Sequence, residues 1–184
     1  MTGSSDGGSS LLTGCEQNLI RQTWTRDPEE LFQLGCEIYI KIFQLAPEAK
    51  PLFPFLHVVI KVTKDQLIPE FKRQAIRFVR VLSECVCYYA EQKGQYKEFE
   101  RYLKVLGASH RNYIKRGLNS HIWDCYATAM KTVLMDLVDF NPFLNLEETQ
   151  IAKRAWKKIV LHITTLIQCG FLDPVEASDQ YVIQ

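Results

Sequence analysis

His110 is the residue whose place in the sequence most clearly suggests chemistry. It ends an apolar helical stripe with steps of four, three and four residues, formed by Phe99, Leu103, Leu106 and His110. Its ring should therefore point inward, where each imidazole nitrogen needs a partner. A metal can take one nitrogen, while Ser109 or a backbone carbonyl one turn back takes the other. The spacing alone favours a hydrogen-bonded core histidine, with a metal ligand as the alternative.

The other histidines and the cysteines form no catalytic or zinc pattern. We expect His57, His121 and His162 to face solvent or to bond locally, because no pair of them has a zinc-ligand spacing. No local sequence supports a Ser–His–Asp or Cys–His arrangement, so we expect no catalytic residue. The six cysteines include no CxxC pair. We interpret them as reduced cytosolic thiols, mostly small core residues.

Composition excludes several classes of function. Lysine plus arginine number 22 and aspartate plus glutamate 21, which gives a formal net charge of +1. We therefore expect neither nucleic acid nor an acidic membrane surface as a partner. No apolar stretch is long enough to insert across a bilayer, and the N-terminal MTGSSDGGSS lacks a secretory-signal pattern. These features predict a cytoplasmic protein.

Helical periodicity fills the chain between two polar ends, which predicts an all-α fold. We expect an N-terminal tail at 1–12, one domain at 13–171 and a C-terminal tail at 172–184. The expected helices are one at about 15–26, one from Pro28 to Ala46 capped by Asp27, one from Pro69, a shorter one after a turn near Gly94, and two long ones, the last from Asn145 with Glu148 in a capping box to a stop at Gly170.

Taken in order, several residues are similar to landmarks of the globin family. Trp24 stands in the first helix, and Gly35 stands where the second helix crosses the distal helix. Pro47 and Phe53 resemble the corner that follows. PEFKRQAIR resembles the start of the distal helix, YLKVLGASH the proximal run, and AWKKIVLHITTLIQCGF the last helix. The likeness extends from about Cys15 to Phe171 and is greatest to single-domain animal globins of the nematode and neuroglobin-like kind.

The resemblance implies a globin fold of seven to eight helices around a haem b. It makes His110 the proximal iron ligand, with Ser109 placed to orient the ring. It places Tyr39 and Gln74 on the distal side, facing a bound gas; the alternatives are a core aromatic for Tyr39 and a surface amide for Gln74. The other expected haem contacts are Phe53, Arg77 (toward a propionate), Phe78, Leu106, Leu118, Trp123 and Tyr126.

Some distal residues depart from the family pattern. Gln74 takes the place of the distal histidine, and Phe78, one turn later, takes that of a valine. Ala75 replaces a common glycine, but Gly35 opposite it should keep the helix crossing close. The span from Gln74 to His110 is a few residues longer than in vertebrate globins, and we place that insertion near Gly94.

These features predict a protein that reversibly binds oxygen, and other diatomic gases, for storage, transport or scavenging. Two alternatives stay open. One is a redox or gas sensor whose haem state is recognised by a partner. The other is chemistry at the iron, such as nitric oxide dioxygenation, peroxidation or nitrite reduction. The second alternative requires an external reductase, because we expect no fused reductase domain. The sequence leaves the oligomeric state open.

Overall fold

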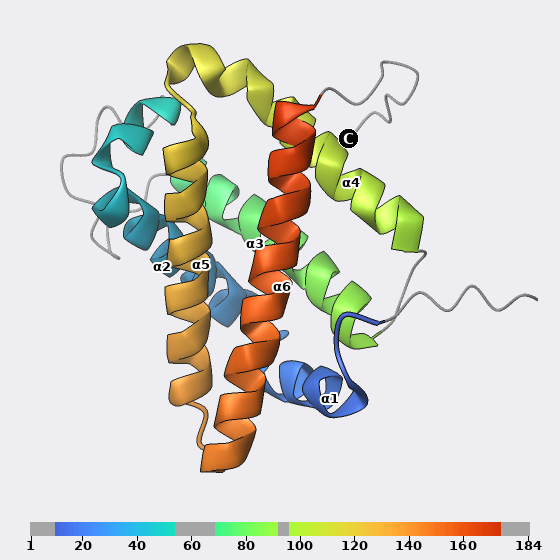
Figure 1. Cartoon of the computed structure of the whole chain (residues 1–184). Helices are drawn as coiled ribbons and strands as arrows, with labels where there is room; N and C mark the ends of the chain where they lie inside the picture. The colour runs from blue at the N-terminus through green and yellow to red at the C-terminus, as the bar shows by residue number, and fades with distance from the viewer. Residues whose placement is uncertain (1–9, 54–68, 92–95, 174–184) are drawn as a thin grey trace, which may run out of the picture.

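Helices form the whole architecture of the part of the chain that the computed structural model describes, residues 10–53, 69–91 and 96–173. In these residues no strand occurs, and six α-helices and two 3-10 helices are present, in agreement with the predicted all-α class (Figure 1). The predicted turn at Gly94 and the residue His57 lie outside the described ranges. In chain order the elements are α1 (Gly14–Thr23), α2 (Pro28–Leu45), η1 (Pro47–Leu52), α3 (Pro69–Glu91), α4 (Tyr96–Ser109), η4 (His110–Arg116), α5 (Ser120–Asp139) and α6 (Leu146–Leu172).

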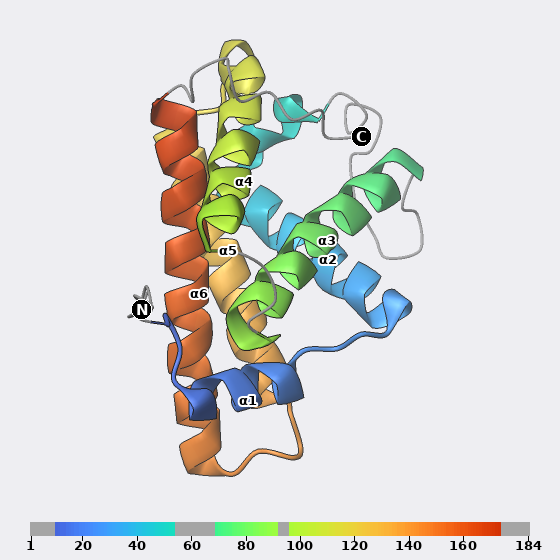
Figure 2. The same cartoon turned by 90° about the vertical axis from the view of Figure 1, so that its right-hand side faces the viewer.

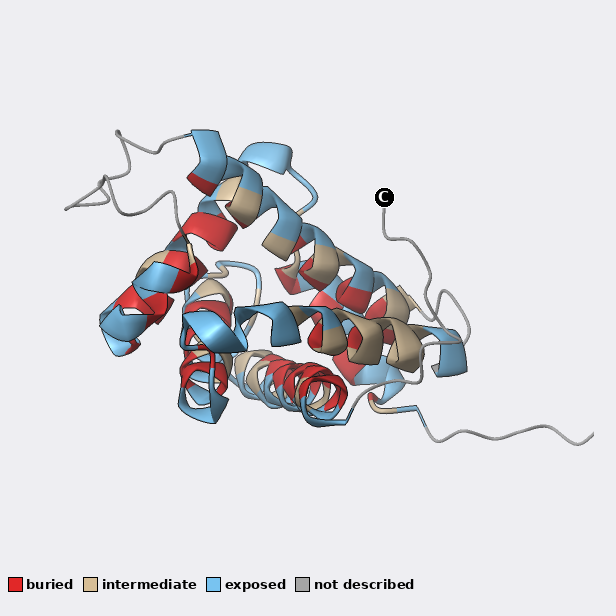
Figure 3. Cartoon of the chain, turned by 90° about the horizontal axis from the view of Figure 1, so that it is seen from above, coloured by how far each residue is buried: buried red, intermediate tan, exposed pale blue. Residues whose placement is uncertain are grey.

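The helices pack around two long ones, α5 and α6, which run antiparallel beside each other (Figure 1). Helix α4 lies along the later half of α6, and α1 crosses its earlier half (Figure 2). Helix α2 packs against both α3 and α5. Seen from above, buried residues occupy the faces that the helices turn toward one another, and exposed residues occupy the outer faces (Figure 3). No helix in the described ranges combines the length and the apolar character needed to cross a membrane.

Two helix starts are fixed by caps that the sequence predicts. The Asp27 side chain accepts hydrogen bonds at 2.9 and 3.0 Å from the two backbone N–H groups that follow Pro28. The Asn145 side chain accepts from the backbone of Glu148 at 3.0 Å, and the Glu148 carboxylate accepts from the Asn145 backbone at 2.9 Å. These bonds satisfy N–H groups that a helix start leaves without partners.

Two predicted helix ends are wrong. Helix α1 ends at Thr23 rather than near Arg26, because Trp24 turns to extended backbone (φ −93°, ψ 126°). Its ring packs 5.6 Å from that of Trp156, centre to centre. Helix α6 continues past Gly170 to its end at Leu172 instead of stopping there. The packing of Trp24 on Trp156 accompanies the early end of α1.

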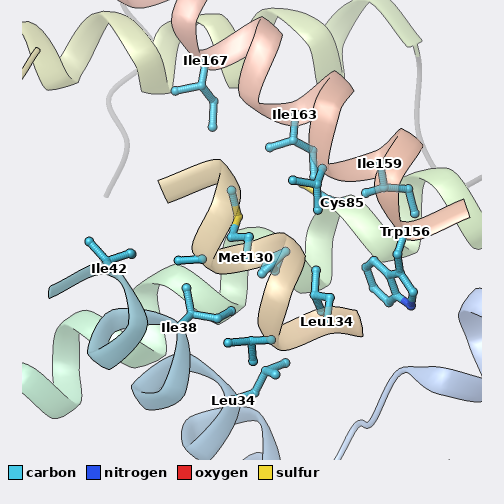
Figure 4. Close-up of a cluster of buried hydrophobic side chains, with 14 of the residues drawn as sticks. Leu34, Ile38, Ile42, Cys85, Met130, Leu134, Trp156, Ile159, Ile163 and Ile167 are labelled. Atoms are coloured by element: carbon cyan, nitrogen blue, oxygen red, sulfur yellow. The ribbon is translucent and has the colours of Figure 1, made fainter. Parts of the chain in front are cut away.

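The hydrophobic core forms where α2, α3, α5 and α6 meet. Burying each aliphatic side chain of this kind contributes about 1.5–3 kcal/mol before the entropy of ordering is subtracted. The core holds α2 and α3 in fixed positions against the antiparallel pair. Its labelled members in Figure 4 are Leu34, Ile38, Ile42, Cys85, Met130, Leu134, Trp156, Ile159, Ile163 and Ile167.

The cysteines agree only in part with their prediction. All lie in described residues, and no disulfide joins them. Cys36, Cys85 and Cys125 are buried, as expected of small core residues. The prediction of mostly core positions fails for the others, because Cys15, Cys87 and Cys169 are exposed.

Helices α4 and α6 touch through their backbones at two glycines. A Cβ added to Gly107 would lie 1.9 Å from the Ile167 carbonyl oxygen, and one added to Gly170 would lie 1.9 Å from the Lys104 carbonyl oxygen. No side chain fits at either position. This contact fixes the position of α4 along α6. Gly107 lies three residues before His110, so the contact helps to position the histidine.

We expect Gly107→Ala to lower the free energy of unfolding by about 1–3 kcal/mol or more, because the helices must separate to admit the methyl group. Gly14→Ala is the matched control, since nothing lies within 4 Å of a Cβ at that position. The control should be neutral or gain up to about 1 kcal/mol from helix propensity. Urea unfolding curves of the two variants give the comparison. Equal stability of the two would show that α4 and α6 do not rely on this contact.

Candidate functional site

The proximal side of the site is built at the junction of α4 and η4. His110 begins η4, directly after the last residue of α4. Its Nδ1 lies 2.7 Å from the backbone carbonyl oxygen of Leu106, one turn earlier. A carbonyl oxygen only accepts, so Nδ1 carries the proton and Nε2 keeps its lone pair. Burial lowers the pKa of His110 below its ordinary value, although the Leu106 hydrogen bond opposes this effect. At neutral pH the side chain is a neutral imidazole with one nitrogen available as a ligand.

The group that orients the ring is the Leu106 carbonyl and not Ser109. The imidazole N–H donates to the Leu106 carbonyl oxygen, and the Ser109 hydroxyl donates to that same oxygen at 2.6 Å. The resemblance to globins therefore predicts the wrong partner. Of the two acceptors that the sequence leaves open, the structure selects the backbone carbonyl, because a helical side chain reaches back toward the preceding turn.

Two aromatic residues of α5, Trp123 and Tyr126, extend the site inward from His110. The Trp123 and His110 ring centres are 5.2 Å apart with planes 64° apart. Trp123 is buried, and its Nε1–H is one of the few buried polar groups in the described residues that lack a hydrogen-bond partner. Tyr126 lies 5.9 Å from Trp123, and burial raises the pKa of its hydroxyl well above the ordinary value. An unpaired buried donor is costly, which marks this place as one where a polar partner belongs.

The distal side is built where α2 crosses α3. A Cβ on Gly35 would lie 2.8 Å from the Ala75 carbonyl oxygen, which confirms the predicted close crossing. The Gln74 amide Nε2 donates to the Tyr39 hydroxyl oxygen at 2.9 Å. Gln74 is half-buried rather than swung out into solvent, and Tyr39 is buried with 2% of its surface exposed. We call Tyr39 and Gln74 the distal pair.

The Tyr39 ring is fixed by other aromatic rings around it. Burial raises the pKa of Tyr39 to about 12; the nearby Tyr113 adds to this rise, while the Gln74 hydrogen bond opposes it. The hydroxyl therefore keeps its proton at neutral pH. Phe78, which stands where the family pattern has a valine, meets the ring edge-on without separating the distal pair. The surrounding rings, at centre distances of 5.5–6.3 Å, are Phe43, Phe53, Phe71, Phe78 and Tyr126.

The two sides belong to one cluster of side chains. The Tyr126 ring centre lies 6.3 Å from that of Tyr39 and 5.9 Å from that of Trp123, and the Trp123 ring packs against His110. Residues from α2, α3, η4 and α5 thus converge. Among the other predicted haem contacts, Leu118 is buried, Phe53 and Leu106 are half-buried, and Arg77 is exposed.

The remaining histidines do different things from one another. His121 is exposed, with Nε2 3.4 Å from the Glu48 carboxylate, as expected of a surface residue. His162 is not solvent-facing: its Nδ1 lies 2.7 Å from the Tyr89 hydroxyl on α3, and its Nε2 lies 3.7 Å from the Glu100 carboxylate on α4. His162, on α6, thus contacts side chains of α3 and α4. The prediction that it faces solvent or bonds locally is therefore wrong.

A single neutral imidazole supplies one ligand, so a metal bound to His110 must bring most of its other ligands with it. In the described residues, no group of three histidine, cysteine or acidic side chains is arranged to hold an ion by itself. A metal already held in a flat aromatic macrocycle suits the aromatic cluster, and its carboxylates can pair with donors such as the Trp123 N–H. The residues present therefore fit a haem.

The fold matches that of a haem protein of known structure. The chain superposes on the crystal structure of a hexacoordinated haem protein from an anhydrobiotic tardigrade with a TM-score of 0.70 and 20% sequence identity, over 88% of this chain and 96% of that one. A family model, Globin, matches residues 36–167. The chain belongs to the globin family.

Several relatives with curated functions are plant proteins. The chain is 31% identical over 109 residues to an anaerobic nitrite reductase of Gossypium hirsutum, which covers 56% of this chain and 61% of that protein. It is 28% identical over 101 residues to one of Physcomitrium patens, 52% of each chain. A more extended match, to one of Brassica napus, is 21% identical over 161 residues, 88% of this chain and 92% of that protein. The matches to the first two thus span less than two thirds of either protein.

Sequence reasoning missed the glycine contact between α4 and α6. Gly107 lies within the apolar run that leads to His110, and a glycine inside a helix is a signal of close backbone approach. Gly170 was expected only as a helix stop. Recognising both as one contact requires knowing that α4 and α6 are neighbours.

Proposed function

We propose that this globin binds haem b through His110 and reversibly binds oxygen beside Tyr39 and Gln74. The observation that carries the proposal is the direction of the hydrogen bond in the distal pair, in which Gln74 donates and the Tyr39 oxygen accepts. That bond occupies a lone pair of the hydroxyl and leaves its proton available. Tyr39 can therefore donate to a ligand while Gln74 holds the Tyr39 hydroxyl in place.

The chemistry of the distal pair suits oxygen more than a gas that gains little charge on binding, such as carbon monoxide. A ferrous haem held by His110 would supply electron density, and oxygen bound to it would carry partial negative charge. A hydroxyl proton in an apolar surrounding stabilises such charge strongly, because little water competes for it. The proton of Tyr39 stays in place, since burial raises the pKa to about 12. The distal pair is thus set to slow the release of oxygen.

The other residues of the proposed site have supporting roles. Phe53 and Phe78 are proposed to pack on the porphyrin, and Leu106, Leu118 and Tyr126 to line it. Arg77 is exposed on α3, a position from which a guanidinium can pair with a haem carboxylate at the surface. The domain is proposed to extend over 13–171, and the protein to work in the cytoplasm, which its unbridged cysteines favour.

We expect the ferrous protein without oxygen to be five-coordinate and high-spin, because an amide such as Gln74 is a poor ligand for ferrous iron compared with imidazole. Absorption spectra of the purified protein, reduced with dithionite and then exposed to oxygen, test this and oxygen binding together. Lack of a reversible change on adding oxygen would overturn the proposed function. A six-coordinate, low-spin spectrum without oxygen would contradict the open sixth position, and the variant His57→Ala would then show whether His57 supplies the ligand.

Nitrite reduction at the same site is a second candidate, favoured by the plant relatives, which are named anaerobic nitrite reductases. The reaction takes one electron from ferrous iron and two protons, and converts nitrite to nitric oxide and water. The distal pair offers a donor for the anion. Anaerobic mixing of the ferrous protein with nitrite, with nitric oxide detected by an electrode, measures the activity; a rate equal to that of free haem would reject it.

A further inference from the structure

The surface of η4 carries a concentration of positive charge that neither oxygen binding nor the fold explains. Residues 111–117 are all exposed, and they include Arg111, Lys115 and Arg116 but no acidic residue. Tyr113 and Ile114 are exposed between them, at 38% and 48%. We call these five residues the basic surface. It lies at the end of the molecule where the chain passes from α4 to α5, at the top of Figure 1.

The charges of the basic surface are not neutralised by ion pairs within the described residues. None of the ion pairs found there involves Arg111, Lys115 or Arg116. Arg116 instead lies over the Tyr113 ring, 5.4 Å from its centre. Because the whole chain has a net charge of only +1, this local excess of three cations is a directional feature of the surface.

The basic surface is joined directly to the proposed iron ligand. His110 is the first residue of η4, and its ring centre lies 6.0 Å from that of Tyr113. A protein seated on Tyr113 and Ile114 is thus separated from the His110 imidazole by one side chain. No other described surface combines exposed apolar side chains, unpaired cations and contact with His110.

We propose that the basic surface docks an acidic electron-carrier protein that reduces the iron held by His110. This inference rests on the proposed binding of haem through His110. In the step, one electron leaves the reduced centre of the carrier and converts iron(III) to iron(II). The carrier is oxidised by one electron, and no bond to the protein forms or breaks. Such a step restores the ferrous state that oxygen binding requires.

The composition of the basic surface favours a protein as the occupant. An apolar centre with a charged rim is the usual arrangement of a protein interface, and electron-transfer interfaces are among the smallest. The basic surface has both components, since Tyr113 and Ile114 are exposed among three cations. Electrostatic attraction then accelerates encounter, and the small apolar centre allows rapid release.

The test uses a plant-type ferredoxin, a small acidic iron–sulfur protein, as the probe. Chemical shifts of the isotope-labelled globin are followed while oxidised ferredoxin is added, and stopped-flow mixing with reduced ferredoxin gives the rate of iron reduction. The variant Arg111→Glu/Lys115→Glu reverses two charges of the basic surface. The control Arg154→Glu/Lys157→Glu makes the same change of charge on exposed residues of α6.

We expect shifts confined to the η4 region, and a rate that falls about tenfold in the η4 variant but less than about twofold in the control at low salt. The difference should shrink at high ionic strength, where screening is strong. Shifts elsewhere, equal losses in both variants, or tighter binding to duplex DNA or anionic vesicles than to ferredoxin would overturn the docking proposal. A failure of the protein to hold haem would instead reject the proposed function, since the shifts do not require iron to be reduced.

Discussion

Replacing His110 with alanine is expected to raise the rate of haem loss by more than about 100-fold. Even the hydrogen-bond partners of metal ligands change affinity by about 10–100-fold, and removal of the ligand itself costs more. The His110 side chain also has the hydrogen bonding and the protonation state that an iron ligand requires. Its Nδ1–H is held by Leu106, its Nε2 is available, and burial keeps it neutral by lowering its pKa.

Haem transfer to an excess of apomyoglobin, followed by absorbance, measures the rate of loss. His121→Ala is the control, because the His121 side chain is exposed and its Nε2 lies beside the Glu48 carboxylate. The control should lose haem at the parent rate. Added imidazole should slow the loss from His110→Ala by filling the vacated space with the same ligand. A His110→Ala protein that keeps its haem and the spectrum of a proximal histidine would disprove the assignment.

Features that depend on neighbouring residues were predictable from the sequence. The Asp27 cap and the capping box of Asn145 and Glu148 are local hydrogen bonds, so residue types at short spacing specify them. The apolar stripe that ends in His110 likewise specifies the direction of its ring. The approach of α2 to α3 at Gly35 was predictable because a resemblance supplied the long-range neighbour, Ala75.

Features that depend on distant residues were not predictable. Trp24 leaves α1 because its ring packs on Trp156, which lies far along the chain. His162 looks like a surface residue in the helical pattern of α6, but α3 and α4 bring Tyr89 and Glu100 to it. In each case the partner becomes a neighbour only when the helices pack.

The distal pair was predicted by type but not by arrangement. The sequence suggests two separate donors to the ligand, one from Tyr39 and one from Gln74. The structure shows instead that one amide N–H of Gln74 donates to the Tyr39 hydroxyl oxygen. Which of two polar groups donates depends on distance and angle, and spacing in the sequence supplies neither.

Substituting Tyr39 by phenylalanine is expected to speed oxygen release about 10- to 100-fold. A hydrogen bond to a charged acceptor contributes about 1.5–3 kcal/mol, and each 1.4 kcal/mol is about tenfold. The phenylalanine ring keeps the packing against Phe53 and Phe78, so the fold should not change. The effect falls on release because the hydrogen bond forms after the ligand arrives. Carbon monoxide acquires less negative charge when bound, so its release should change much less.

Stopped-flow mixing of the oxygenated protein with dithionite and carbon monoxide measures the release rate. Gln74→Leu should speed release less than Tyr39→Phe, because it removes the group that holds the donor and not the donor itself. The double variant Tyr39→Phe/Gln74→Leu should release oxygen at the rate of Tyr39→Phe or slightly faster. In Tyr39→Phe alone, the Gln74 amide is freed and can replace part of the lost hydrogen bond to oxygen. The parent rate should stay constant between about pH 6 and 9, because the pKa of Tyr39 is raised to about 12 by burial. If Tyr39→Phe releases oxygen at the parent rate, the hydroxyl does not reach the ligand, and the distal pair has a structural role only.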